Sequence, residues 1–182
     1  ENEQEFLAAH GKLIPGPLVA FFVSLQDLEK SGNYGELDLS RWMVVTTNSP
    51  SGTVPGGMAT KDFLQGTKDM LEEVYEDPAY LDNATKLTSA HFENQQPDYR
   101  ILDQYYLGHF DETEASFSYA QLARTQYGTG EVGAIVSANN TLLVRDRVIS
   151  FYVYSKSLSL ADFDWVKATS KVWMRELAAL NR

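Results

Sequence analysis

Residues 101–155 read ILDQYYLGHF DETEASFSYA QLARTQYGTG EVGAIVSANN TLLVRDRVIS FYVYS, and this stretch decides the fold. Apolar and polar residues alternate within it, which is the pattern of strands that bury one face. The segments follow one another through connections too short to hold a helix, so neighbouring strands must run antiparallel. We therefore predict a mainly antiparallel sheet with strands at Ile101–Phe110, Ala115–Thr125, Val132–Ser137, Thr141–Val144 and Val148–Ser155.

Short polar segments separate these strands. The acidic stretch Asp111–Glu114 is predicted to form the turn of a hairpin between the first two strands. Ala138–Asn140 divides the third predicted strand from the fourth, and Arg145–Arg147 precedes the fifth.

Two segments outside this stretch have helical periodicity. Residues 60–76 place Phe63, Thr67, Met70, Leu71 and Val74 on one face. Residues 159–180 begin with Ser159 and Asp162, which resemble a capping box, and carry a narrow stripe. Helices combined with a run of strands predict a single α+β domain over residues 1–182, with the helices packed on the sheet. The stripe consists of Phe163, Val166, Ser170, Trp173, Leu177 and Leu180.

The N-terminal part of the chain adds two further strands. The continuous apolar run Leu18–Leu25 predicts a strand buried on both sides, and Leu37–Thr47 predicts the next strand. We expect a short helix at residues 2–13 and a loop at residues 48–57. A short strand is also possible at Lys86–Phe92.

The composition limits the classes of protein to consider. The chain has 182 residues, is 43% hydrophobic and carries a net charge of -10, which opposes binding to nucleic acid and to anionic membrane surfaces. It has no cysteine, which excludes disulfides, zinc–thiolate sites, iron–sulfur clusters and cysteine nucleophiles. No apolar run approaches the ~18 residues that a membrane-spanning helix requires. We expect no nucleic-acid partner, no membrane span and no cofactor.

The sequence contains none of the motifs that mark a catalytic mechanism. Gly128, Gly130 and Gly133 match the letters of the dinucleotide-binding motif Gly-x-Gly-x-x-Gly. A predicted strand follows these glycines, whereas a dinucleotide-binding site needs a helix after them. Two classes of function remain open. The first is a binding or assembly module without catalytic activity, which the sequence favours. The second is a hydrolase that uses carboxylates with His91 or His109.

A candidate binding site lies at the predicted acidic hairpin. Strict alternation places Tyr105, Leu107 and His109 on one face of the first strand, and Tyr106 and Phe110 on the other. A histidine beside three carboxylates would have its charged form favoured, and could bind a cation once it is deprotonated. We expect a cationic ligand or a basic protein partner here, although a solvated turn would explain the same residues. The candidate residues are Tyr105, His109, Asp111, Glu112 and Glu114.

The predicted strands are also rich in aromatic residues. Aromatic residues at alternating strand positions form core contacts on one face and cross-strand pairs on the other. A tyrosine-lined groove for a ligand or a peptide is the alternative interpretation. The set consists of Tyr105, Tyr106, Phe110, Phe117, Tyr119, Phe151, Tyr152 and Tyr154.

The last third of the chain resembles a known family at the level of pattern. Tyr127–Glu131 is followed by a hairpin over Leu142–Tyr154 and then by a helix that contains Asp164, Trp165 and Trp173. This order, over residues 100–181, is similar to the closing hairpin and helix of the Mog1/PsbP-like fold and of uncharacterised exported bacterial proteins with that architecture. The resemblance implies an αβα sandwich and a mostly non-catalytic role in assembly, partner binding or cation binding. It assigns no functional residue.

The resemblance also leads us to expect an exported bacterial protein, periplasmic or secreted. The printed chain begins with the polar residues Glu1–Glu5 and has no initiating methionine. Removal of a signal peptide would account for this start, and so would a boundary chosen for expression.

Overall fold

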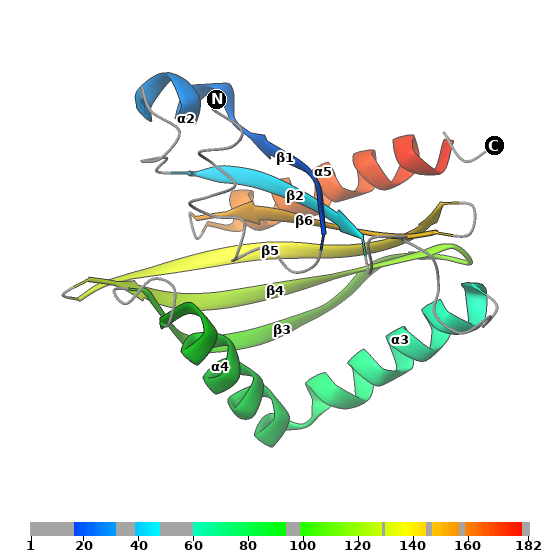
Figure 1. Cartoon of the computed structure of the whole chain (residues 1–182), viewed down its shortest axis with the longest axis horizontal. Helices are drawn as coiled ribbons and strands as arrows, with labels where there is room; N and C mark the ends of the chain where they lie inside the picture. The colour runs from blue at the N-terminus through cyan, green and yellow to red at the C-terminus, as the bar shows by residue number, and fades with distance from the viewer. Residues whose placement is uncertain are drawn as a thin grey trace.

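A six-stranded antiparallel sheet forms the centre of the molecule (Figure 1). The computed structural model describes residues 17–31, 39–47, 60–93, 99–128, 130–144, 147–156 and 159–179. The strands lie side by side in the order β1-β2-β6-β5-β4-β3, and every neighbouring pair is antiparallel. The predicted α+β fold with helices packed on an antiparallel sheet is therefore confirmed. In chain order the elements are β1 (Leu18–Val23), α2 (Leu25–Ser31), β2 (Arg41–Thr47), α3 (Thr60–Glu76), α4 (Pro78–Glu93), β3 (Tyr99–Thr113), β4 (Ser116–Tyr127), β5 (Glu131–Val144), β6 (Arg147–Ser155) and α5 (Leu160–Ala179).

Helix α5 covers one face of the sheet, where the larger part of the hydrophobic core lies. Val166 of this helix is fully buried, and Phe163 and Trp173 pack partly buried around it. Burial of one large apolar side chain contributes about 1.5–3 kcal/mol, so this stripe is sufficient to hold the helix on the sheet. The residues buried in this core are Met43, Val45, Val136, Ala138, Leu142, Phe151, Val153, Val166 and Met174.

Helices α3 and α4 lie on the opposite face (Figure 1). Leu142 belongs to the core under α5, whereas its neighbour Leu143 packs with Leu64 of α3. Successive side chains of a strand point to opposite faces, so α3 and α5 are on different sides of the sheet. Helix α4 packs mainly along β3, and α3 packs on β4. Both helices thus cover the β3–β4 side of this face. Within the described ranges, none of the helices has the length and hydrophobicity needed to cross a membrane.

Two expectations about the N-terminal half of the chain are wrong. Strand β1 is not buried on both sides but forms an edge of the sheet, and Val19 is 59% exposed. Among the described strands β1 pairs with β2 alone, and an apolar run does not distinguish an edge strand from a central one. Residues 86–92 belong to α4 instead of a strand. The predicted helix at residues 2–13 and the predicted loop at residues 48–57 lie outside the described residues.

Two expectations about the strand ends are also wrong. The hairpin turn between β3 and β4 is formed by Glu114 and Ala115, so Asp111 and Glu112 belong to β3 itself. Strand β5 continues through the polar segment that was expected to divide it. The side chain of Asn140 allows this, because its amide donates to the carbonyl oxygens of Ala138 and Phe151 at 3.2 and 3.1 Å and to the hydroxyl of Ser170 at 3.1 Å.

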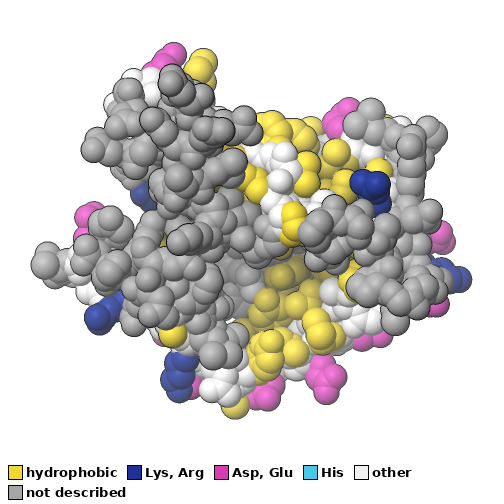
Figure 2. All heavy atoms as spheres, in the orientation of Figure 1, with side chains coloured by type: hydrophobic (Ala, Val, Ile, Leu, Met, Phe, Trp, Pro, Cys, Tyr) yellow, Lys and Arg dark blue, Asp and Glu magenta, His cyan; other side chains and the backbone are white. Residues whose placement is uncertain are grey.

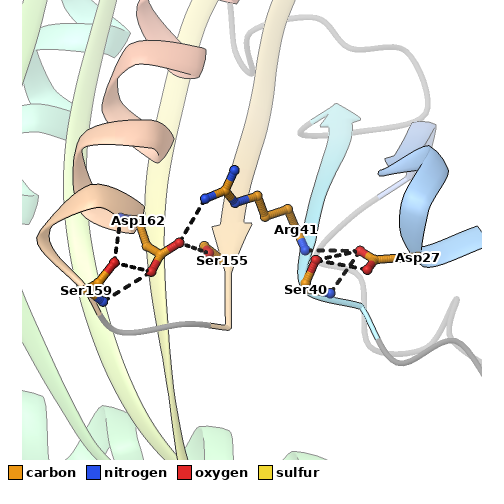
Figure 3. Close-up of polar contacts among 6 residues, drawn as sticks. All are labelled: Asp27, Ser40, Arg41, Ser155, Ser159 and Asp162. Atoms are coloured by element: carbon orange, nitrogen blue, oxygen red, sulfur yellow. Dashed lines mark hydrogen bonds and ion pairs between the residues drawn. The ribbon is translucent and has the colours of Figure 1, made fainter. Parts of the chain in front are cut away.

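The carboxylate of Asp162 joins the start of α5 to two strands (Figure 3). Ser159 and Asp162 form a reciprocal cap: the Asp162 amide donates to Ser159 Oγ at 3.3 Å, and the Ser159 amide donates to Asp162 Oδ2 at 3.2 Å. The Ser155 hydroxyl at the end of β6 donates to Oδ1 of the same carboxylate at 3.3 Å. Arg41 at the start of β2 contributes an ion pair of 3.0 Å. The predicted capping residues therefore also connect the helix with the sheet.

A second carboxylate, that of Asp27 in α2, holds the chain just before β2 (Figure 3). Asp27 is only 1% exposed and accepts hydrogen bonds from the amide and the hydroxyl of Ser40, both at 2.9 Å, and from the Arg41 amide at 3.3 Å. Burial by itself would raise the pKa of this carboxyl, but the hydrogen bonds from Ser24, Ser40 and Arg41 outweigh it and lower the pKa. Arg41 thus contacts Asp27 through its backbone and Asp162 through its guanidinium group.

Replacement of Asp162 by alanine is expected to destabilise the protein by about 2–3 kcal/mol. The change removes a helix cap and leaves the Arg41 guanidinium and the Ser155 hydroxyl without this acceptor. Equilibrium unfolding in urea measures the effect. Asp164→Ala is the matched control, because Asp164 lies in the same helix and is exposed; it should change the stability by less than about 0.5 kcal/mol. Equal losses in the two variants would contradict this role of Asp162.

Candidate functional site

The face of the sheet opposite α5 carries a row of polar and aromatic side chains. Residues paired directly across neighbouring strands point to the same face. Tyr154 of β6 pairs with Trp42 of β2. Tyr152 of β6 pairs with Asn139 of β5, which in turn pairs with Tyr119 of β4. We call the following set the tyrosine face: Trp42, Tyr106, Tyr119, Gln121, Asn139, Tyr152 and Tyr154 from the sheet, with Tyr75 from α3.

The rings of the tyrosine face pack against one another in two places. The Trp42 and Tyr154 rings are stacked, with their centroids 4.9 Å apart and an interplanar angle of 12°. On the other side of the face, Tyr75 of α3 stacks on Tyr106 of β3 at 4.6 Å and 3°. Tyr75 also contacts Tyr119 at 5.7 Å in a tilted arrangement. These contacts restrict the rings, so the hydroxyl groups at their ends have fixed positions.

Hydrogen bonds connect the centre of the sheet with α3. The Asn139 amide donates to Gln121 Oε1 at 3.3 Å, and the Gln121 amide donates to the Tyr75 hydroxyl oxygen. The Tyr119 hydroxyl also bonds to that of Tyr75. The chain Asn139–Gln121–Tyr75 therefore fixes the orientation of Tyr75 over the sheet.

The tyrosines of this face have raised pKa values. Burial is the main cause for Tyr75, Tyr119, Tyr152 and Tyr154, as the phenolate form is poorly solvated there. Burial also raises the pKa of Tyr106 to about 12, and the charges of Glu72 and Glu76 add to the effect. These phenols are therefore neutral at ordinary pH and act as uncharged hydrogen-bond donors and acceptors.

The surface view is consistent with this placement. In Figure 2, hydrophobic side chains reach the surface between the sheet and the helices α3 and α4, and acidic side chains lie along the lower edge of the view. Trp42, Tyr106, Tyr119, Tyr152 and Tyr154 are each partly exposed. The tyrosine face is thus accessible in part, although it lies where a sheet buries its core.

His109 lies on the tyrosine face, and the strict alternation predicted for β3 is wrong. The register shifts between Tyr106 and Gly108, where Gly108 has a φ of 94° that favours glycine. This bulge places His109 on the same face as Tyr106, whose hydroxyl lies 2.7 Å from His109 Nδ1. Tyr105 pairs with Leu122 and lies on the face covered by α5.

The remaining candidate residues of the acidic segment do not converge. Glu112 lies on the α3 side, where Lys68 pairs with its carboxylate at 2.7 Å. Asp111 pairs with Ser118 and points to the other face, and Glu114 is exposed in the turn. In the part of the chain that the structure describes, no group of three or more His, Asp or Glu side chains is placed to hold a metal ion.

The structure describes the surroundings of one of the two histidines proposed for a hydrolase. His91 lies in α4, and its side chain is outside the described part of the structure. His109 Nδ1 is 3.4 Å from Glu72 Oε1 and 2.7 Å from the Tyr106 hydroxyl. The carboxylate of Glu72 is therefore within reach of His109. The hydroxyl close to His109 is the phenol of Tyr106.

Sequence reasoning identified the tyrosines of the strands but not their partners. Tyr106, Tyr119, Tyr152 and Tyr154 belong to the predicted aromatic set, whereas Tyr105, Phe110 and Phe151 of that set lie on the α5 side. Tyr75, Trp42, Gln121 and Asn139 were not singled out. The sequence contains one weak signal for Tyr75, which directly follows Val74, the last residue of the predicted apolar stripe of α3.

Above pH 10, the stability of the protein is expected to fall partly through Tyr106. The unfolded phenol ionises near pH 10 and the folded one near 12, so the folded state retains a proton that the unfolded state has lost. The free energy of unfolding should therefore decrease as the pH rises across this window. Unfolding in urea at several pH values measures the slope.

Tyr106→Phe should make that slope less steep between pH 10 and 12. Tyr105→Phe, which removes an exposed phenol from the other face, serves as the control. An unchanged slope in Tyr106→Phe would show that the Tyr106 phenol is not held neutral by its surroundings.

Comparison with known proteins does not assign this arrangement to a family. No family model matches the sequence, and no curated protein matches it either. The function must therefore be inferred from the tyrosine face and from the residues around it.

Proposed function

We propose that this chain is a non-catalytic binding module and that the tyrosine face is its ligand-binding surface. The observation that carries the proposal is the hydrogen-bonded, partly exposed set of uncharged polar and aromatic side chains in the middle of the sheet. Binding sites for small molecules combine aromatic walls with a few fixed polar groups in this way. The face under α5 differs from the tyrosine face, because most of the side chains buried there are apolar.

The chemistry of the site supports binding in preference to catalysis. A tyrosine nucleophile needs a lowered pKa, whereas the pKa values of Tyr75, Tyr106 and Tyr119 are raised. The groups close to His109 are Glu72 and Tyr106. A tyrosine held neutral is suited to donate a hydrogen bond and unsuited to attack a substrate.

The order of elements supports a role like that implied by the Mog1/PsbP-like fold. Two strands, two helices, four strands and a final helix follow one another in the described chain from β1 onward, apart from the short α2. Helices lie on both faces of the sheet, as in an αβα sandwich. On this basis we propose a Mog1/PsbP-like sandwich and an extracytoplasmic bacterial location, periplasmic or secreted. Cell fractionation with an antibody tests the location, and recovery in the cytoplasm alone would refute it.

The alternative function is a hydrolase that uses His109 with Glu72. The specific observation in its favour is the distance of 3.4 Å between His109 Nδ1 and Glu72 Oε1, which permits a carboxylate to orient the imidazole. Both groups lie at the margin of the tyrosine face, so a bound molecule would be near them.

One experiment tests the binding function against the alternative. The purified protein is incubated with a small-molecule extract of the producing cells, and the retained and unretained molecules are identified by mass spectrometry. We expect an intact molecule to be retained. Gln121→Ala should reduce its retention several-fold, since that change breaks the hydrogen-bond chain that orients Tyr75.

The control and the contrary outcomes use the same extract. Tyr105→Phe, on the other face of the sheet, should retain as much as the unaltered protein. Conversion of a molecule into a product, abolished in His109→Ala, would instead establish the hydrolase. Retention that is absent, or that does not change in Gln121→Ala, would contradict the proposed binding surface.

A further inference from the structure

Tyr154 has a hydroxyl group whose hydrogen-bonding capacity the described residues do not use. Its ring is fixed between Trp42 and Tyr152, with centroid distances of 4.9 and 6.2 Å. Burial raises the pKa of Tyr154, and none of the hydrogen bonds among the described residues involves its hydroxyl. Tyr154 is partly exposed and its hydroxyl is not fully buried, so a molecule bound on the tyrosine face can be its hydrogen-bond partner.

The pair of hydroxyls on Tyr75 and Tyr119 presents a second donor. The Tyr75 oxygen accepts a hydrogen bond from the Gln121 amide, and the Tyr75 hydroxyl bonds to that of Tyr119. One hydroxyl donates in the bond between the two tyrosines, so the proton of the other remains for an acceptor on this face. Tyr75 and Tyr154 each interact electrostatically with Tyr152, and Tyr119 interacts with all three, so these hydroxyls lie in one region.

The surroundings of these hydroxyls favour a ligand without charge. The groups that shift the pKa values of Tyr119, Tyr152 and Tyr154 are burial and uncharged side chains. A bound ion would lose its hydration there without gaining a counter-charge. At the margin of the face, Glu72 and Glu76 act on Tyr106 and would repel an anion.

We infer that the tyrosine face takes a small uncharged molecule with a flat apolar ring and an oxygen that accepts hydrogen bonds from Tyr154 and from the Tyr75–Tyr119 pair. The ring would lie against the aromatic side chains, and the oxygen would complete the two unused donors. This inference rests on the proposed binding function and specifies the class of its ligand.

Three probes of the same size and different charge test the inference: acetophenone, benzoate and benzylammonium. All three carry one benzene ring, but only acetophenone combines neutrality with an acceptor oxygen. Isothermal titration calorimetry measures their affinities for the full chain, and the indole resonance of Trp42 in a proton–nitrogen NMR spectrum reports whether they occupy this face. We expect acetophenone to bind at least tenfold more tightly than either ion and to shift the Trp42 resonance.

Two variants make the test specific. Tyr154→Phe should weaken acetophenone binding about threefold to tenfold, because one hydrogen bond is lost. It should leave the melting temperature unchanged, since the hydroxyl has no partner within the described chain. Tyr105→Phe is the matched control and should bind acetophenone as the unaltered protein does.

The possible failures separate the inference from the proposed function. If benzoate or benzylammonium binds as tightly as acetophenone and shifts Trp42, the face binds ligands but the assignment to an uncharged ligand is overturned. Acetophenone binding that Tyr154→Phe does not change would overturn the assigned hydrogen bond. If none of the three probes shifts Trp42, the inference is overturned and the proposed function also loses its support.

Discussion

The buried carboxylate of Asp162 is the interaction on which the arrangement of this molecule depends. It caps α5 and accepts hydrogen bonds from Ser155 at the end of β6 and from Arg41 at the start of β2. The carboxylate thereby fixes where the helix begins relative to two neighbouring strands. Because α5 then covers the aliphatic face of the sheet, the opposite face is left to α3, α4 and the tyrosine face.

The two faces of the sheet differ in the polarity of the side chains that they bury. Under α5, most of the buried side chains are apolar and gain stability from burial, and the buried Asn140 bonds to Ser170 of the helix. On the tyrosine face, the same strands bury part of each ring but must also satisfy hydroxyl and amide groups, which they do through Gln121 and Asn139. Polar groups in such a position contribute less to stability than aliphatic ones and demand a fixed geometry. Their concentration on one face is the reason for our proposal that this face binds a ligand.

The sequence was sufficient to predict the elements whose signals are local. The stripe and the cap of α5 identified that helix to within a residue of its bounds, and the short connections implied antiparallel pairing. Signals that depend on partners were not sufficient. Lys86–Phe92 has no periodicity that distinguishes a helix from a strand, and it is helical next to β3. The continuity of β5 depends on Asn140, whose amide is satisfied by Phe151 and Ser170, both distant in the chain.

The candidate site was predictable only in part, because one residue changes the assignment of faces along β3. Alternation is reliable as long as no residue is inserted into the ladder, and the bulge at Gly108 inserts one. It moves His109 away from Tyr105 and toward Tyr106. A glycine within a strand pattern is the signal that could have indicated this shift. The bulge thus brings the imidazole of His109 next to Glu72 and Tyr106, at the margin of an otherwise uncharged face.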